Sequence, residues 1–268
     1  MQRSPAHRPV QIGSVSYLNA KPLIYGLEKD PGVHLSLEIP AKLIDGLRDG
    51  RFDVALLPII DYQRLPNLKL LTAGGIGSDG TTYTVRIFSR VPIEQIESLA
   101  CDVESHTSVA LARIILAESF GIQPEFVDRK HSMHDLSRVS AMLLIGDKVV
   151  REKPEGYPYQ LDLGEAWKNL TGLPFVFAAW IARGDVQLGD LPGKLVKARE
   201  EGLAHASEIV ERFATQHGWP PDLAMKYLTE YLQYSIGPRE LAAIEKFFSY
   251  AAKRGIIPSP ARSIVTTE

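Results

Sequence analysis

Three hydroxyl side chains at the start of one helix-like segment form the clearest candidate binding site in the sequence. Ser105, Thr107 and Ser108 follow the apolar segment 99–103 and stand at the start of segment 106–120, whose apolar residues recur at helical spacing. The first amides of a helix have no partner within it, and the helix dipole favours negative charge there. With Ser105 as N-cap, the segment predicts a site for a small anion such as a carboxylate. A helix cap without a ligand explains the same pattern as well.

A glycine and a carboxylate follow the buried strand-like segment 140–145. Gly146 would let a ligand approach the main chain closely. Asp147 could contribute to the same site, although capping of a following helix is the commoner role for such a carboxylate. Both residues are therefore candidate binding residues.

The glycines of residues 75–80 match the spacing of a dinucleotide-binding fingerprint. That fingerprint must open a helix whose N-terminus holds the pyrophosphate, whereas residues 82–87 have the pattern of a strand. We therefore expect these glycines to shape a tight loop at the lip of a cleft, with Ser78 facing a ligand.

Several common catalytic chemistries have no motif in the sequence. His131 and His134 are close in sequence but lie in a polar stretch with no nearby cysteine, which is a poor set of metal ligands. No Gly-x-Ser-x-Gly elbow, Gly-Lys-Ser/Thr phosphate loop or HExxH helix occurs. The single cysteine, Cys101, lies in an apolar segment, which indicates a buried structural thiol. We expect neither a metal nor a cofactor.

Composition and charge disfavour two further classes. The chain has 268 residues and a formal net charge of −2, with basic residues scattered among acidic ones, so it has no basic face for nucleic acid. No stretch reaches the roughly 18 apolar residues of a membrane span, and residues 1–9 lack the apolar core of a secretory signal. We therefore expect a cytoplasmic protein whose partner is a small molecule, and the sequence predicts no oligomeric state.

Strand-like and helical segments alternate through much of the chain, and the end of the chain is helical. This order is typical of an α/β fold with parallel pairing. The expected strands are 10–15, 33–39, 53–57, 81–89, 99–103, 125–127, 140–145 and 175–182, and the expected helices are 41–48, 106–120, 193–216, 221–231 and 238–253.

Two strand-like segments are placed to cross between two α/β lobes. The first lobe would comprise residues 1–86 and 178–268, and the second, inserted lobe residues 87–177. Ligands of α/β sheets bind beyond the carboxyl ends of strands, and pockets favour domain interfaces. We therefore predict that a ligand cleft lies between the lobes.

Six motifs are spread along the chain between residues 14 and 178. They are SVSYLNAKPL (14–23), FDVALLP (52–58), IGSDG (76–80), TSVAL (107–111), LIGD (144–147) and TGLPFVFA (171–178). Together, and in this order, they resemble the chorismate dehydratase family of menaquinone biosynthesis, and residues 234–238 (YSIGP) are similar as well. The resemblance implies a type II periplasmic-binding-protein fold, a lyase activity on the futalosine route, and chorismate as the carboxylate substrate, which would lose water to give 3-[(1-carboxyvinyl)oxy]benzoate.

The resemblance also suggests roles for the first motif. Ser16 and Tyr17, with Ser78, would line the wall opposite the helix N-terminus, and Asn19 would orient the reacting groups or stabilise developing charge. Helix capping is the alternative role for Asn19. Because the motifs contain no histidine and no evident base near Asn19, a substrate carboxylate could take the proton.

Two alternatives share this fold. One is 1,4-dihydroxy-6-naphthoate synthase of the same pathway, which typically begins with a Ser-Pro-Cys-Pro-Asn-Asp motif where this chain has Ser-Tyr-Leu-Asn-Ala-Lys-Pro. The other is a binding protein for a small carboxylate that performs no chemistry. Residues 81–83 also depart from the smaller, proline-containing pattern of related sequences, so the lip of the cleft could be shaped differently.

Overall fold

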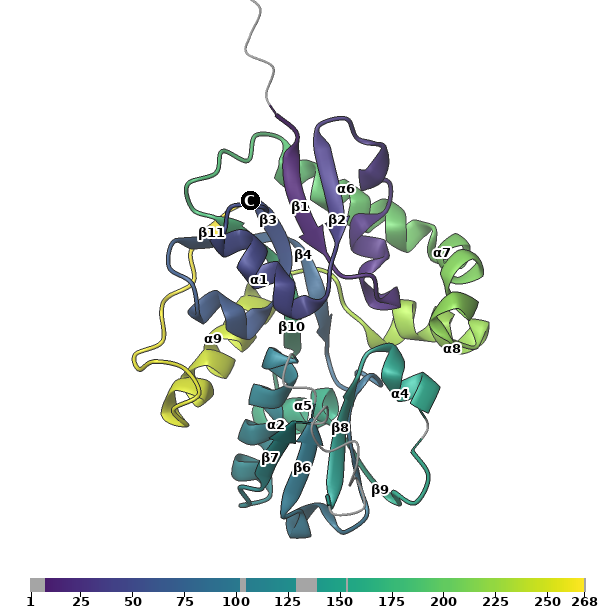
Figure 1. Cartoon of the computed structure of the whole chain (residues 1–268), viewed down its shortest axis with the longest axis vertical. Helices are drawn as coiled ribbons and strands as arrows, with labels where there is room; N and C mark the ends of the chain where they lie inside the picture. The colour runs from purple at the N-terminus through teal and green to yellow at the C-terminus, as the bar shows by residue number, and fades with distance from the viewer. Residues whose placement is uncertain (1–7, 102–104, 129–138, 153, 268) are drawn as a thin grey trace, which may run out of the picture.

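The computed structural model describes residues 8–101, 105–128, 139–152 and 154–267. These residues form two α/β lobes, one above the other in Figure 1, and each lobe is built on its own sheet. The upper lobe has a six-stranded sheet in the order β11-β4-β10-β3-β1-β2, and the lower lobe has a five-stranded sheet in the order β7-β6-β8-β5-β9.

The strands of the upper sheet come from both ends of the chain. They are β1 (Val10–Ser14), β2 (Val33–Leu37), β3 (Val54–Pro58), β4 (Leu68–Ser78), β10 (Phe175–Arg183) and β11 (Thr266–Thr267). Strand β1 pairs in parallel with β2 and β3, whereas β10 runs antiparallel between β3 and β4. The parallel part was expected from the strand and helix alternation, and the antiparallel return strand carries the chain back from the lower lobe.

The lower sheet uses one continuous stretch of the chain. Its strands are β5 (Val85–Ser89), β6 (Ser98–Cys101), β7 (Glu125–Asp128), β8 (Ala141–Ile145) and β9 (Tyr159–Asp162). Here β6 is parallel to β7 and β8, and β5 is antiparallel to β8 and β9.

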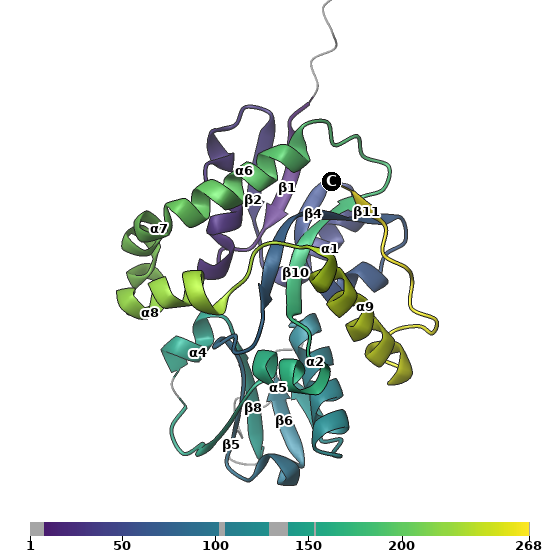
Figure 2. The same cartoon turned by 180° about the vertical axis from the view of Figure 1, so that it is seen from behind.

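The helices pack around the two sheets, which Figure 2 shows from behind. They are α1 (Pro40–Arg48), α2 (His106–Ser119), α4 (Asp147–Glu152), α5 (Leu163–Thr171), α6 (Leu191–Ala204), α7 (Ala206–Phe213), α8 (Pro221–Lys226) and α9 (Pro238–Lys253). Short 3-10 turns span Leu18–Ala20, Pro22–Ile24, Leu27–Lys29, Ile59–Gln63, Ile93–Gln95 and Thr215–His217, and a π-helical turn spans Tyr227–Tyr231. The helix expected over 193–216 is thus divided between α6 and α7.

The loop prediction for residues 75–80 is wrong for residues 75–78, which belong to β4. Gly75 and Gly77 lie within β4, where a Cβ atom would come within 2.5 Å and 2.7 Å of main-chain oxygens of β10. Glycine is required there because β10 approaches β4 closely at two register irregularities. These glycines reflect a close contact between two strands, and the sequence pattern alone does not distinguish such a contact from a turn.

Two short segments cross between the lobes. The first, residues 79–84, joins β4 to β5, and the second, residues 172–174, joins α5 to β10. Val85 already pairs with β8 in the lower sheet, and Phe175 already pairs with β4 in the upper one. We propose lobe boundaries at these two segments, a few residues before the positions 86/87 and 177/178 expected from the sequence.

Candidate functional site

A cleft between the lobes encloses about 730 Å³ of space, including the part open to solvent. Its wall comes from both lobes and from the first crossing segment. The upper lobe contributes Val15, Tyr17, Asn19, Pro40, Leu56, Pro58, Ile76, Phe177, Ala178, Tyr227 and Leu232, the crossing segment Thr82 and Thr84, and the lower lobe Val85, Ser105, His106, Thr107, Ser108, Ile145 and Gly146. This set contains no Asp, Glu, Lys or Arg, so neutral donors and one histidine provide its polar chemistry.

Asn19 is positioned by the 3-10 turn that follows β1. Tyr17 is the residue preceding this turn, so Asn19 lies inside it, and the alternative of a helix cap is wrong. The Asn19 Nδ2 atom donates to the Tyr227 hydroxyl at 3.3 Å. Its Oδ1 atom is buried and has no hydrogen-bond partner within the described part of the chain. A buried polar atom of this kind in a cleft is suited to a ligand group.

Tyr227 is the second polar group of this wall. Its hydroxyl lies 2.7 Å from Thr84 Oγ1, and its ring stacks on Trp219 at a centroid distance of 4.5 Å. Burial raises the pKa of the Tyr227 phenol, against the lowering effect of its bonds with Thr84 and Asn19. The phenol therefore keeps its proton at neutral pH, and Asn19, Thr84 and Tyr227 form one hydrogen-bonded chain.

The N-terminus of α2 faces the same cleft from the lower lobe. Ser105 occupies the N-cap position, as expected, but its side chain makes no capping hydrogen bond. Thr107 Oγ1 accepts from the Ile60 amide at 3.2 Å, which ties α2 to the upper lobe. Ser105, Thr107 and Ser108 all lie in the cleft wall. The structure thus brings the helix N-terminus and these hydroxyls together at the cleft, and their binding of an anion stays a prediction.

A histidine was missed in this wall. His106 Nδ1 lies 2.9 Å from both carboxylate oxygens of Asp61, which is fully buried in the upper lobe, and 2.7 Å from an Arg64 nitrogen. The motifs themselves contain no histidine, but His106 directly precedes the TSVAL motif and lines the cleft, so their lack of a histidine does not exclude one from the site. The pairing joins the lobes, and the histidine ring is a second candidate for accepting a proton.

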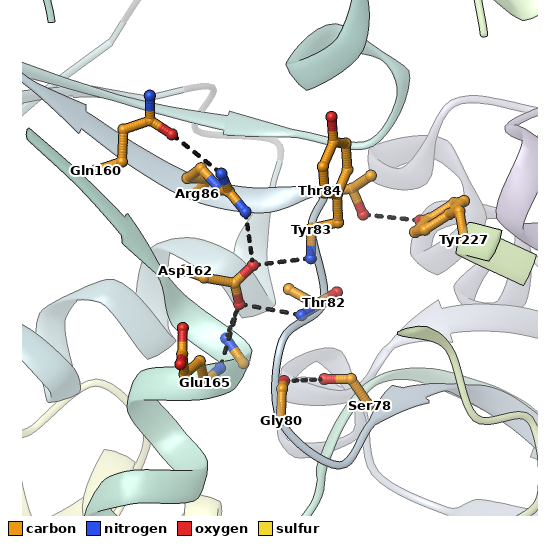
Figure 3. Close-up of polar contacts among 11 residues, drawn as sticks. Ser78, Gly80, Thr82, Tyr83, Thr84, Arg86, Gln160, Asp162, Glu165 and Tyr227 are labelled. Carbon is orange, nitrogen blue, oxygen red and sulfur yellow. Dashed lines mark hydrogen bonds and ion pairs between the residues drawn. The ribbon is translucent and has the colours of Figure 1, made fainter. Parts of the chain in front are cut away.

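Three predicted residues do not line the cleft. Ser16 is exposed and is not part of the cleft wall. Ser78 is buried at the end of β4, where its hydroxyl donates to the Gly80 carbonyl at 3.1 Å (Figure 3). It stabilises the turn into the crossing segment, so its expected orientation toward a ligand is not seen.

Asp147 is the third. Its carboxylate accepts from Trp219 Nε1 at 2.8 Å and lies 2.6 Å from His217 Nδ1. Asp147 is itself the first residue of α4, so it does not cap that helix. Instead it joins the lower lobe to the loop before α8, and only its neighbour Gly146 reaches the cleft. Local sequence patterns could not predict these two partners of Asp147, because they are 70 or more positions away along the chain.

The described residues contain neither a cluster of metal ligands nor a membrane-spanning helix. Within them, no group of three or more His, Cys, Asp and Glu side chains could hold a metal ion. His131 and His134 lie outside the described residues. The described helices include none that is long and apolar enough to cross a bilayer.

The two sheets, the paired crossing segments and the cleft between lobes define a periplasmic-binding-protein-like fold. A crystal structure of an Archaeoglobus fulgidus protein superposes with a TM-score of 0.73 at 18% identity, covering 94% of this chain and all of that one. The periplasmic aliphatic sulphonate binding protein SsuA of Escherichia coli superposes with a TM-score of 0.67 at 14% identity, covering 96% of each chain. At these identities the similarity establishes the fold.

The family follows from sequence comparison. A family model described as "Menaquinone biosynthesis" matches residues 10–253, so the chain belongs to that family. It is 30% identical to the chorismate dehydratase of Thermus thermophilus, over 87% of this chain and 92% of that protein. It is 26% identical to the chorismate dehydratase of Campylobacter jejuni, over 88% and 95%, and 25% identical to the 1,4-dihydroxy-6-naphtoate synthase of Thermus thermophilus, over 85% and 90%.

Proposed function

We propose that this protein is a chorismate dehydratase of menaquinone biosynthesis, acting on the futalosine route in the cytoplasm. The observation that carries the proposal is the similarity, over nearly nine tenths of the chain, to two proteins named chorismate dehydratase. The cleft supports it, because its wall combines a helix N-terminus, which favours a bound anion, with neutral hydrogen-bond donors.

The reaction needs little from the protein besides binding and orientation. Chorismate carries two carboxylates, a ring hydroxyl and an enolpyruvyl ether. Loss of the hydroxyl together with the hydrogen on the ether-bearing carbon makes the ring aromatic and releases one water. The product is 3-[(1-carboxyvinyl)oxy]benzoate. Because aromatisation supplies the driving force, positioning and electrostatic stabilisation can account for catalysis.

The two walls of the cleft divide these tasks in the proposal. Ser105, Thr107 and Ser108 bind one substrate carboxylate at the N-terminus of α2. On the opposite wall, the Asn19 amide, whose Nδ2 donates to Tyr227 and whose Oδ1 is unpartnered within the described residues, orients the reacting part of the substrate together with the neutral Tyr227 phenol, with Tyr17 beside them. Ser16 and Ser78, which do not line the cleft, have no part in this arrangement.

One proton must leave the ether-bearing carbon. We assign its acceptance to a substrate carboxylate held against Asn19 and Tyr227, because the described residues of the wall include no Asp or Glu. His106 is the alternative acceptor, favoured by its place in the wall and its contact with Asp61. A variant at position 106 separates the two roles.

The 1,4-dihydroxy-6-naphthoate synthase activity is the second candidate function, because one relative with that name is 25% identical. A carboxylate receptor without turnover is the third, since the same fold serves sulphonate binding in SsuA. The purified protein, offered chorismate and cyclic dehypoxanthinyl futalosine in parallel reactions, distinguishes the three, with products identified by mass and binding followed by calorimetry. We expect turnover of chorismate only. Turnover of the futalosine compound alone would identify the synthase, and binding of chorismate without product would identify a receptor.

A further inference from the structure

Asp162 lies outside the cleft wall but contacts the segment that forms part of it. It ends β9 and occupies the N-cap position of α5, and it is almost completely buried. One carboxylate oxygen, Oδ1, accepts from the amides of Gly164 at 3.0 Å and Glu165 at 3.2 Å. These two bonds are an ordinary N-cap of α5.

The same carboxylate also binds the first crossing segment (Figure 3). Its Oδ1 accepts from the Thr82 amide at 3.1 Å, and its Oδ2 accepts from the Tyr83 amide at 2.8 Å. An Arg86 nitrogen lies 3.4 Å from Oδ2. Helix capping therefore accounts for only part of the hydrogen bonding of Asp162, and the rest holds residues 82–86.

Tyr83 has a main-chain conformation that needs such support. Its φ angle is +65°, in the left-handed region that residues with a side chain seldom adopt. Its amide is held by Asp162, and its ring stacks on Tyr231 at a centroid distance of 5.8 Å and contacts the Arg86 guanidinium. The crossing segment is thus bent at Tyr83 and fixed on both sides of the bend.

The N-terminus of α5 also presses against this segment. A Cβ atom on Gly164 would lie 2.5 Å from the Gly80 carbonyl oxygen and 2.7 Å from Ser78 Oγ. Any other residue at position 164 would push the helix and the crossing segment apart. This close fit is independent of the carboxylate and points to the same function for the helix end.

The bend determines where Thr84 lies. The Thr84 amide donates to the Thr82 carbonyl at 2.8 Å, and the Thr84 carbonyl accepts from the Gly146 amide at 2.8 Å. With its main chain fixed in this way, Thr84 places its hydroxyl against the Tyr227 phenol, on the opposite lobe. The phenol in turn contacts Asn19.

We infer that Asp162 is a positioning residue of the cleft: it bends the first crossing segment so that Thr84 meets Tyr227 and Asn19 in the geometry that the reaction uses. The inference rests on the proposed dehydration for its kinetic consequence. The structural part, that Asp162 fixes the Tyr83 amide, holds for any ligand of the cleft.

Asp162→Asn tests this inference because it separates the two roles of the carboxylate. An asparagine oxygen in the place of Oδ1 keeps the cap of α5 and the bond from Thr82. Its NH2 group then faces the Tyr83 amide and Arg86, which are both donors. We expect a folded protein with kcat for chorismate lowered about tenfold to 100-fold and KM changed by less than about threefold, and with faster hydrogen exchange at the Tyr83 amide.

Asp30→Asn is the matched control. Asp30 also accepts from a main-chain amide, that of Gly32 at 2.7 Å, and from a cation, Lys194 at 3.1 Å, but it lies in the loop before β2, away from the cleft. We expect its kcat to equal that of the unaltered protein. Gly164→Ala displaces the crossing segment without removing a carboxylate, and we expect it to lower kcat in the same way as Asp162→Asn.

A double variant tests the role of the bend itself. Glycine adopts a φ of +65° without strain, so Tyr83→Gly removes the need for support at that position. In the Tyr83→Gly background, Asp162→Asn should therefore lower kcat by a smaller factor than it does in the protein that retains Tyr83. An equal loss in both backgrounds would contradict the proposed coupling through Tyr83.

The outcomes distinguish this inference from the proposed function. Normal chorismate turnover by both the unaltered protein and Asp162→Asn would overturn the inference and leave the function intact. A lack of turnover by the unaltered protein would overturn the proposed function and the kinetic part of the inference, and the exchange rate of the Tyr83 amide would then decide the structural part. An unchanged exchange rate in Asp162→Asn would overturn that part too.

Discussion

The hydroxyl oxygens of Thr84 and Tyr227 lie 2.7 Å apart, although 143 positions separate them in the chain. Thr84 stands where the chain crosses into the lower lobe, and Tyr227 begins the π-helical turn after α8. Their contact closes one side of the cleft and connects through the phenol to Asn19. The polar centre of the site is therefore assembled from three distant parts of the chain.

Asn19→Asp tests the donor role of Asn19. The change keeps the size of the side chain but replaces the NH2 donor, which faces Tyr227, with a carboxylate oxygen. We expect kcat for chorismate to fall by about 100-fold or more, as for the loss of one preorganised donor. Asn169→Asp, on an exposed position of α5, is the matched control and should leave kcat unchanged. Retained turnover in Asn19→Asp would remove Asn19 from the mechanism.

Tyr227→Phe should lower turnover, because it removes the hydroxyl and leaves the ring stacked on Trp219. We expect a loss in kcat of about tenfold to 100-fold. Tyr234→Phe is the control, since the Tyr234 hydroxyl is also buried but has no hydrogen-bond partner within the described residues. Its kcat should be unchanged, and its free energy of unfolding unchanged or raised by up to about 1 kcal/mol. Steady-state kinetics and urea unfolding of both variants provide the comparison, and equal kinetic losses would refute a specific role for the Tyr227 hydroxyl.

Stability should fall in alkaline solution. Burial raises the pKa of both Tyr227 and Tyr234 above the ordinary value of 10.0. Above that pH the folded chain retains protons that the unfolded chain releases. The contribution of the two tyrosines to the free energy of unfolding is therefore complete below about pH 10 and is lost as the pH rises further. Urea unfolding between about pH 8 and about pH 11 measures the slope of the free energy of unfolding against pH. The slope should be smaller in Tyr234→Phe, and an identical slope in that variant would count against the burial effect.

His106→Gln distinguishes the two candidate proton acceptors. Glutamine can still hydrogen-bond to Asp61 across the lobes but cannot accept the proton. With a substrate carboxylate as acceptor, we expect kcat to fall by less than about tenfold, whereas loss of a general base typically costs about 100-fold or more. A pH profile of kcat/KM completes the measurement. A loss of the larger size would transfer the role of base to His106.

Local patterns in the sequence were sufficient for most of the fold. The strand and helix alternation around β1, α1 and β3 is regular, and each element has a clear hydrophobic period. The elements β9, α4 and α5 were not among the expected strands and helices, and β4 was missed: residues 68–74 were not assigned, and the following glycines, which serve a close approach to β10, were taken for a loop. A pattern along one strand contains no information about the strand that packs beside it.

The site was predictable only where its residues are close in sequence. The N-terminus of α2 is a local motif, so the sequence alone was enough to place Ser105, Thr107 and Ser108 at the cleft. Tyr227 and the contact of Asp147 with Trp219 depend on helices returning from the end of the chain. Their sequence context is that of ordinary helical core residues, which explains why they were missed.

The proposed dehydratase activity is tested by the reaction of the purified, unaltered protein with chorismate, followed through the loss of the cyclohexadiene absorbance and the mass of the product. We expect complete conversion to 3-[(1-carboxyvinyl)oxy]benzoate with one water released for each chorismate consumed. Chorismate that binds in the cleft and is recovered unchanged would contradict it.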